Sequence, residues 1–200
     1  MSVVSNIIVF KKVDSEYFYR LLHPRPVVLV AVKAQDGRVN FMACSWVTPV
    51  SEDPPLIALA LSRESYTRDI ILEVKEFTVN IPSLQLLEEV WISGTTSGRE
   101  VDKVAKTGVE LGRAENVSAP VIQGSIGYLE CKLKEYHEVG ECTLIVGEVI
   151  GAYARENTFE RGTWRLEKTS PLLHLGSVYF TTANRYTVKP ASLKKKKKRS

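Results

Sequence analysis

The stretch VVLVAVKAQDGRVNFMAC, residues 27–44, decides the fold of this chain. Its first six residues are apolar and mostly β-branched without polar alternation, which is typical of a strand buried on both faces. Asp36-Gly37 is a strong signal for a tight turn, and residues 39–44 run back as a second strand. The stretch therefore predicts a buried β-hairpin.

Further strands follow the hairpin in consecutive runs. Apolar or β-branched segments predict them at residues 46–50, 56–61, 77–81, 126–136, 143–153, 172–175 and 178–181. Short helices are expected at residues 15–22, 66–74, 84–91 and 101–106, a flexible polar loop at 93–98, and irregular structure over 154–169. Because strands are not regularly separated by helices, the order predicts a mainly β protein: a closed or nearly closed antiparallel barrel with helices outside it.

The length of 200 residues suits one domain. We expect residues 1–190 to form it and residues 191–200 to be a disordered basic tail. Lys194 to Arg199 carry six positive charges, and subtracting these from the net charge of +4 leaves −2 for the rest. Such a run either stays solvated or contacts nucleic acid or anionic lipid, and the lack of interleaved aromatic residues favours the solvated end.

Several classes of protein are excluded by what the sequence lacks. No apolar run approaches the ~20 residues that cross a bilayer, and the first residues do not resemble a signal peptide, so we expect a cytoplasmic protein without membrane contact. Three cysteines without CxxC spacing and three scattered histidines argue against disulfides and a metal site. Phosphate-binding glycine loops and a GxSxG elbow are both absent, which argues against the common nucleotide-binding motifs and a serine hydrolase.

Two polar stretches stand out among the strands. Residues 40–51 place Asn40, Ser45 and Thr48 at a strand corner, where small residues would let a flat ligand approach the backbone. Residues 62–68 combine hydroxyls and Arg63 at the start of a helix, which suits a phosphate monoester. The alternatives are a polar turn in the first stretch and an ordinary helix N-cap at Ser65 or Thr67 in the second.

At these two stretches the chain resembles the flavin reductase-like family of FMN-binding split barrels, in particular its flavoredoxin-type members. The resemblance runs from Pro24 to Tyr179. Its signatures occur in the family's order: residues 25–30, 40–51 followed by Asp53-Pro54-Pro55, Ser62-Arg63 with residues 67–70, 77–81, 97–103, 147–149 and 171–176.

The resemblance implies a six-stranded antiparallel split barrel that forms a homodimer and binds FMN near the dimer interface, with FAD as the alternative flavin. Hydride would come from NAD(P)H, and the acceptor would be an electron-transfer protein or a partner oxygenase. The implied cofactor-binding residues are Asn40, Ala43, Cys44, Ser45, Trp46, Val47 and Thr48 around the ring, Ser62, Arg63, Ser65 and Thr67 at the phosphate, Ser97, Gly98 and Lys103 in a closing loop, and His174.

One position departs from the family pattern. Many reductases of the family have Gly-Asp-His where this chain has Gly140-Glu141-Cys142, and a thiol does not replace a protonatable imidazole at neutral pH. His174 and Cys142 are therefore the catalytic candidates, and His137 could reach the same region from the opposite strand. The prediction is an NAD(P)H-dependent flavin reductase or a flavoredoxin-like electron carrier; the alternatives are a non-catalytic flavin-binding module and a nucleic-acid binder that uses the basic tail.

Overall fold

A computed structural model describes residues 8–185, 187, 188 and 190. Its main feature is a curled antiparallel sheet with the strand order β3-β2-β6-β9-β10-β5-β4. These strands are β2 (Val28–Lys33), β3 (Val39–Cys44), β4 (Val47–Ser51), β5 (Leu56–Ser62), β6 (Glu76–Ile81), β9 (Gly127–Val139) and β10 (Cys142–Ala154). The two edge strands, β3 and β4, are joined through Ser45-Trp46, and β3 also contacts β5, so the sheet curls into a barrel that is split at this corner.

The predicted hairpin is formed by β2 and β3. Its register pairs Val28 with Cys44, and Gly37 adopts a φ of +88° in the turn, where a side chain would be strained. The Asp36 carboxylate accepts a hydrogen bond from the Arg38 backbone N–H over 3.0 Å and so closes the turn.

Strand β2 lacks polar alternation because both of its faces are covered. Val28, Val30 and Val32 belong to the core inside the barrel, which also holds Phe77 and Ile145. The intervening residues Val27, Leu29 and Ala31 belong to a second core, in which Phe41, Leu86, Val90 and Ile122 cover the outer face of the sheet. The fully apolar run of the hairpin therefore follows from burial on both sides.

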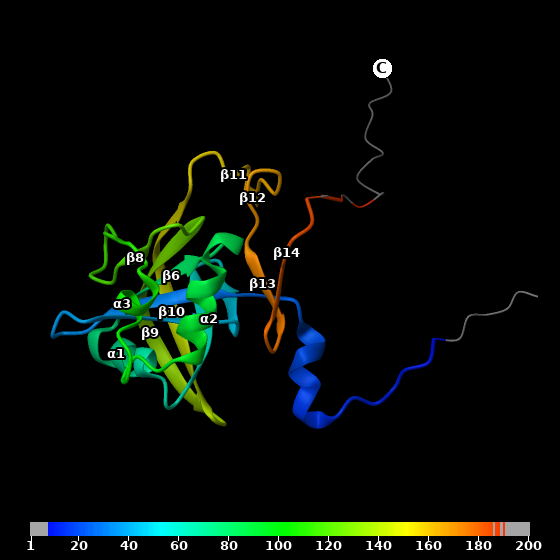
Figure 1. The fold of residues 1–200 in the computed structure, drawn as a ribbon, viewed down its shortest axis with the longest axis horizontal. Coiled ribbons are helices and arrows are strands. Elements are labelled where there is room, and N and C mark those ends of the chain that lie inside the picture. Colours follow the sequence, from blue (N-terminus) through cyan, green and yellow to red (C-terminus); the bar gives the residue numbers. More distant parts are fainter. Residues whose placement is uncertain (1–7, 186, 189, 191–200) are drawn as a thin grey trace, which may run out of the picture.

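Three α-helices pack on the barrel: α1 (Tyr66–Val74), α2 (Leu87–Thr95) and α3 (Lys103–Thr107), with the 3-10 turn η2 (Leu84–Leu86) before α2 (Figure 1). The prediction of a loop from residue 93 was wrong, because α2 continues to Thr95. The hydroxyls of Ser93, Thr95 and Thr96 donate to the carbonyls of Val90, Trp91 and Ile92, which lets polar residues end the helix.

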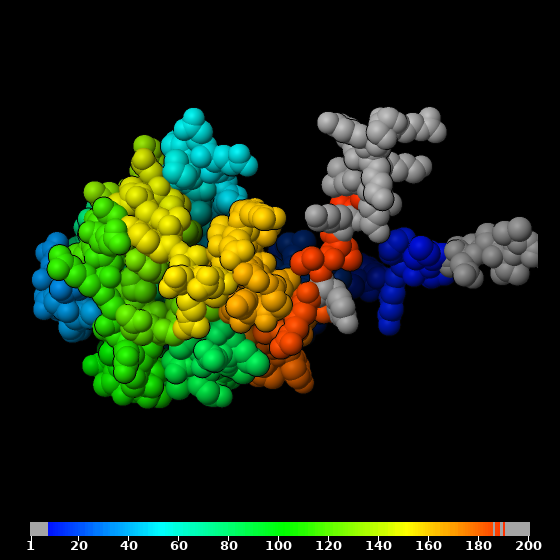
Figure 2. Space-filling view, turned by 90° about the horizontal axis from the view of Figure 1, so that it is seen from above, coloured from blue at the N-terminus to red at the C-terminus, as the bar shows by residue number. Residues whose placement is uncertain are grey.

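A second sheet lies beside the barrel and consists of β1 (Arg25–Pro26), β13 (Leu172–Gly176) and β14 (Tyr179–Thr182). The segment η1 (Ser15–Leu22), capped by Asp14, is a 3-10 helix that buries none of its residues. Figure 1 shows β13, β14 and η1 together at the side of the barrel, and in Figure 2 the first described residues, in dark blue, extend away from the body. Leu172 of β13 is fully buried in the second core and Phe180 of β14 packs against it, whereas η1 stays exposed.

Five two-residue strands were not predicted: the pair β7 (Leu111–Gly112) and β8 (Val121–Ile122), the pair β11 (Phe159–Glu160) and β12 (Thr163–Trp164), and β1. The first pair flanks a loop that the buried Glu130 carboxylate anchors. This carboxylate accepts hydrogen bonds from the backbone N–H groups of Glu115 and Asn116 over 2.6 and 3.0 Å. Segments this short carry no periodicity from which sequence could predict them.

The main sheet has seven strands, one more than the six that the resemblance implies. Within the described residues, no helix has the length and apolar character needed to cross a bilayer. The predicted basic tail, residues 191–200, lies outside the described residues. The single-domain organisation of residues 1–190 and the cytoplasmic location stay predictions.

Candidate functional site

A cleft of about 370 Å³ opens where β3, the start of α1, the end of α2 and α3 meet. This volume is in the range of small-molecule sites in proteins. The residues that line the cleft are Asn40, Met42, Ser62, Glu64, Ser65, Tyr66, Thr67, Ser93, Gly94, Thr95, Thr96, Ser97, Gly98 and Lys103. The structure thus brings together seven of the predicted cofactor-binding residues: Asn40, Ser62, Ser65, Thr67, Ser97, Gly98 and Lys103.

The N-terminus of α1 faces this cleft. Ser65 is the N-cap, and its hydroxyl accepts a hydrogen bond from the Arg68 backbone N–H over 3.3 Å. Thr67, in the first turn, is buried and accepts a hydrogen bond from the Asn40 amide over 2.7 Å. Helix N-termini carry partial positive charge and unpaired N–H groups, so this end of the cleft favours an anion.

Lys103 adds a full positive charge to the same cleft. Its side chain is only 4% exposed, and its ammonium donates to the Ser93 carbonyl over 2.8 Å. In the part of the chain that the structure describes, no carboxylate forms an ion pair with it. Burial lowers the pKa of this lysine to about 8. Two of the three ammonium donors therefore remain for a ligand, and an anion would relieve the cost of burying the charge.

A second hollow of about 250 Å³ adjoins the cleft and shares Gly94 and Thr95 with it. Its walls are largely apolar, with Val27, Ala43, Ser45, Val90, Trp91, Ser177, Phe180 and His174. Three predicted cofactor-binding residues, Ala43, Ser45 and His174, meet here. A flat apolar body in this hollow could thus be joined to an anionic group in the cleft.

Close backbone approaches shape both spaces. A Cβ at Gly98 would lie 2.0 Å from Asn40 Oδ1, and a Cβ at Gly94 would lie 3.3 Å from the Cβ of Ala43. The end of α2, at Gly94, and the loop after it, at Gly98, can therefore lie this close to β3 because these positions lack side chains. The described residues contain no cluster of three or more histidine, cysteine or carboxylate side chains that could hold a metal ion.

A family model described as the flavin reductase like domain matches residues 19–183. The chain belongs to the flavin reductase-like family. An uncharacterized protein of Pyrococcus abyssi is 34% identical over 164 residues, which cover 82% of this chain and 93% of that relative.

Solved structures of flavin proteins share the split-barrel fold. A flavoredoxin from Methanosarcina acetivorans has a TM-score of 0.82 at 28% identity, over 94% of this chain and 98% of its own. An FMN-binding protein from Thermus thermophilus with bound 1-cyclohex-2-enone has a TM-score of 0.77 at 26% identity, over 92% and 98%. The FMN-binding split barrel is therefore the fold of this family member.

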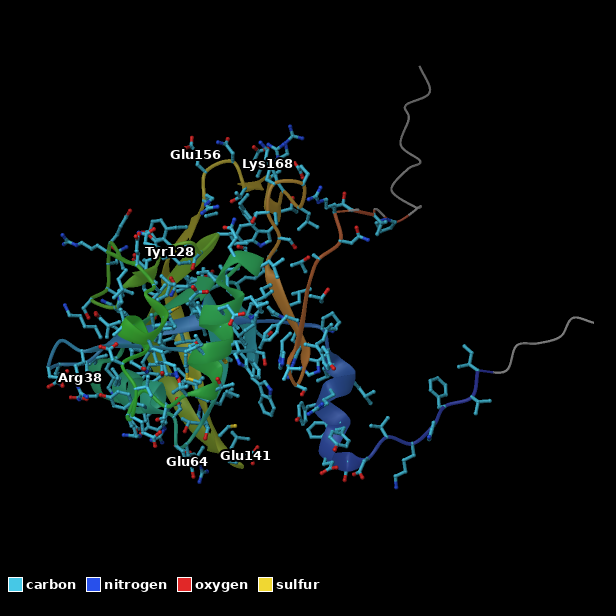
Figure 3. The ribbon with its side chains drawn as sticks, viewed as in Figure 1. Arg38, Glu64, Tyr128, Glu141, Glu156 and Lys168 are labelled. Atoms are coloured by element: carbon cyan, nitrogen blue, oxygen red, sulfur yellow. The ribbon has the colours of Figure 1, made fainter. Side chains whose placement is uncertain are left out.

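Other predicted site residues lie outside the two spaces. The Arg63 guanidinium pairs with Glu138, with 2.7 Å between Nε and Oε2. The backbone N–H of Arg63 donates to the carbonyl of Glu141. Figure 3 shows Glu141 next to Glu64, at the end of the long hairpin. Arg63 is thus held by the hairpin and does not line the cleft.

The predicted residues of the strand corner, apart from Asn40, Ala43 and Ser45, also lie outside the cleft and the second hollow. Cys44 is buried in the barrel core, Val47 packs against that core, and the exposed Thr48 donates its hydroxyl to the Pro49 carbonyl. Trp46 and Cys142 line a separate apolar hollow of about 400 Å³. Burial, followed by the Glu141 carboxylate, raises the pKa of the Cys142 thiol, so this side chain stays protonated at neutral pH.

His174 is the protonatable residue of the second hollow. A carbonyl only accepts, so His174 Nε2 donates to Ser177 O over 3.1 Å. The His23 ring packs edge-on against it at 5.2 Å, and Arg25 donates to His23 Nε2 over 3.0 Å. Burial and the nearby Arg25 lower the pKa of His23, which keeps this second imidazole neutral.

Sequence reasoning missed part of the lining. Met42, Tyr66 and the hydroxyl run from Ser93 to Thr96 were not predicted to be site residues, and neither were Trp91 and Phe180. The hydroxyl run is the one signal that could have found them, since the sequence places four hydroxyl residues within Ser93–Ser97 after an apolar helical pattern, without an evident folding role.

Proposed function

We propose that this protein binds FMN and uses it as an oxidoreductase. The observation that carries the proposal is the buried Lys103 ammonium, which faces a cleft at the N-terminus of α1 without a carboxylate partner among the described residues. The family and the flavin-binding structural neighbours support the same ligand. The donors in the cleft fit a phosphate monoester, because it can accept from an ammonium, hydroxyls and backbone N–H groups at once.

Each part of the site would hold a different part of the cofactor. Ser65, Thr67 and Lys103 would hold the phosphate, and the hydroxyls of Thr95 and Ser97 would face the ribityl chain. Ala43, Ser45 and His174 would line the ring. When bound, the flavin supplies hydride and electron transfer, with NAD(P)H as the donor. The protein contributes position and electrostatics, and the apolar walls of Val27 and Phe180 keep water from the reacting edge.

His174 is the residue that would move a proton in the second hollow. Its Nε2–H is tied to Ser177, and His23 packs against its ring. The ring orientation is thereby fixed, which a proton donor needs. Cys142 lies in a different hollow and remains a thiol, so it does not replace the reductase histidine.

Two roles fit this site: a flavin reductase that releases reduced flavin to a partner oxygenase, and a flavoredoxin-like carrier that keeps its FMN and passes electrons to a protein. The missing reductase histidine favours the carrier. The rate of NADH oxidation with and without added free FMN separates them, because only a reductase turns over free flavin.

A second copy of the chain is the partner that the exposed side of the molecule fits. Phe18 and Leu21 of η1 are 65% and 69% exposed, and Tyr179 of β14 is 67% exposed. Apolar groups exposed together on adjoining elements are typical of association surfaces. His23, which follows η1, and strand β14 both lie beside His174, so a homodimer through this surface would bring its partner near the second hollow. Sedimentation velocity should give twice the chain mass of 22.4 kDa; a monomer would contradict this.

Substitution of Lys103 by Met tests the FMN site. The two side chains have similar length, and Met removes the buried charge without emptying its space. Loss of a charge-assisted contact should weaken FMN binding by about 10- to 150-fold in a fluorescence titration.

Riboflavin, which has no phosphate, serves as the matched ligand. Its dissociation constant should change by less than about twofold in the Lys103→Met variant. Equal weakening of both ligands would show that Lys103 supports the fold rather than the phosphate, and unchanged FMN affinity would contradict the site.

A further inference from the structure

The loop of residues 96–102 joins α2 to α3 and forms one wall of the cleft. Thr96, Ser97 and Gly98 line the cleft from this loop, and Lys103 follows directly after it. FMN bound as proposed would therefore lie between the loop and the N-terminus of α1. The contacts that hold the loop in place thus bear on how firmly the cofactor is enclosed.

One ion pair ties this loop to α1. Among the described residues, the other hydrogen bonds of the loop join it to itself, to α2 or to α3. The exception is the Arg99 guanidinium, which donates to the Asp69 carboxylate on α1. Arg99 Cζ also lies 5.0 Å from the ring centroid of Tyr66, the first residue of α1. Arg99 thus makes both an ion pair and a cation–π contact from the loop to α1.

The Asp69 carboxylate is also held from its other side. Its second oxygen accepts a hydrogen bond from the Arg68 guanidinium over 2.9 Å. Arg68 in turn donates to Glu138 over 2.8 Å and to the Thr143 hydroxyl over 3.0 Å. Glu138 and Thr143 belong to the long hairpin of β9 and β10, and Thr143 is fully buried. An isolated exposed ion pair contributes little, but this pair belongs to a network of oriented charges that is anchored on the barrel.

We propose that Asp69 and Arg99 are positioning residues that retain FMN by holding the loop against the bound cofactor. The inference rests on the proposed flavin site. Neither residue lines the cleft, so neither would touch the cofactor directly. The ion pair would set the rate at which FMN leaves. Slow release is what an electron carrier requires, whereas a reductase that hands its flavin to a partner requires fast release.

The charges of the two residues separate this role from a simple electrostatic effect. Arg99 would attract the FMN phosphate and Asp69 would repel it, because opposite charges attract and like charges repel. If only the field of each charge mattered, loss of the Asp69 charge should slow the release of FMN. If the ion pair holds the loop, the same loss should speed the release, because the loop loses its anchor on α1.

Stopped-flow dissociation of FMN from the full chain, with an excess of a flavin-trapping protein, tests the proposal. The Arg99→Gln variant should release FMN about three- to thirtyfold faster than the wild type, because it loses one ion pair and one cation–π contact. The Asp69→Asn variant should release FMN about two- to fivefold faster, because it loses the ion pair alone. The double variant should release FMN no faster than Arg99→Gln, since both substitutions break the same pair.

The Arg38→Gln variant is the matched control. Arg38 also pairs with an aspartate, Asp36, and its Cζ lies 5.8 Å from the ring centroid of Tyr66. It belongs to the turn between β2 and β3, however, and not to the loop. Figure 3 shows Arg38 at the edge of the barrel that points away from β13 and β14. The release rate of this variant should stay within about twofold of the wild-type rate.

Several results would overturn the proposal while leaving the flavin site intact. Slower FMN release from Asp69→Asn would show that the two residues act only through their charges. An unchanged rate in Arg99→Gln, or an equal increase in Arg38→Gln, would show that this ion pair does not hold the loop. Faster release together with a lower urea midpoint of the flavin-free variants would assign the pair to folding. Failure of the wild type to bind FMN would instead overturn the flavin site itself, and the inference with it.

Discussion

Lys103 is the first residue of α3, and its ammonium lies against the C-terminal end of α2, where it donates to the Ser93 carbonyl. The partial negative charge of that helix end tolerates the buried cation but supplies only one of its hydrogen bonds. A phosphate bound at Ser65 and Thr67 would supply the rest. In the proposed site, a bound phosphate would thus account for the burial of this lysine, which the folded chain alone pairs with one carbonyl.

The pKa of Lys103 predicts how FMN affinity depends on pH. In the free protein, burial lowers this pKa to about 8. A bound phosphate stabilises the charged form, so the complex holds the proton to a higher pH than the free protein does. Affinity is therefore full below the free pKa and falls as the pH rises through it, by about tenfold one unit above it.

Titrations of FMN at several pH values measure this dependence. In the Lys103→Met variant the FMN affinity should stay constant over the same pH values, because the titrating group is absent. A wild-type affinity that stays constant, or that rises with pH above 8, would show that the ammonium does not face the phosphate.

At single residues, sequence reasoning was most informative where local chemistry decides the structure. Ser65 is a side-chain N-cap as predicted, and this follows from its place before an apolar helical pattern. The position of Arg63 could not be predicted, because its partner Glu138 is 75 residues away and reaches it only through the pairing of β10 with β5 and β9.

At the scale of elements, β10 shows how one glycine fits a strand to the barrel core. A Cβ at Gly147 would lie 2.5 Å from Cζ of Phe77, whose ring is fully buried. The ring fills the space that a side chain at Gly147 would occupy. Sequence could predict the strand from its apolar pattern but not this contact, since β6 and β10 are separated in the sheet by β9.

The Gly147→Ala variant should lower the free energy of unfolding by about 1–3 kcal/mol, because the added methyl group overpacks the core. Urea unfolding measures this as a lower midpoint with an unchanged slope. In the Phe77→Leu background the same substitution should cost less, since the smaller side chain leaves room. Equal costs in both backgrounds would contradict the contact.

The helix before the site shows the limit of local patterns. Apolar spacing placed the end of α2 at Trp91, but hydroxyl-to-carbonyl hydrogen bonds extend the helix to Thr95. Serine and threonine usually favour loops, and contacts of this segment with β3 and Lys103, which lie outside the local pattern, accompany its helical structure.

At the scale of the whole molecule, the barrel was predictable because its strands follow one another along the chain and the central strand β2 is apolar on both faces. The site was less predictable from the sequence. It joins residues from Asn40 to His174 that come from β3, α1, α2, α3 and β13, and no spacing rule relates these segments. The resemblance to a family supplied most of the predicted site residues. The structure was needed to show that Cys44 to Thr48 do not all face the site and that Arg63 is held by the long hairpin.

Equilibrium dialysis of the wild-type protein against FMN and, in parallel, riboflavin is the most direct test of the flavin site. One FMN should bind per chain, and riboflavin should bind at least tenfold more weakly, because it lacks the phosphate for Lys103 and the N-terminus of α1. FMN that does not bind, or that binds no better than riboflavin, would contradict the assignment of the cleft.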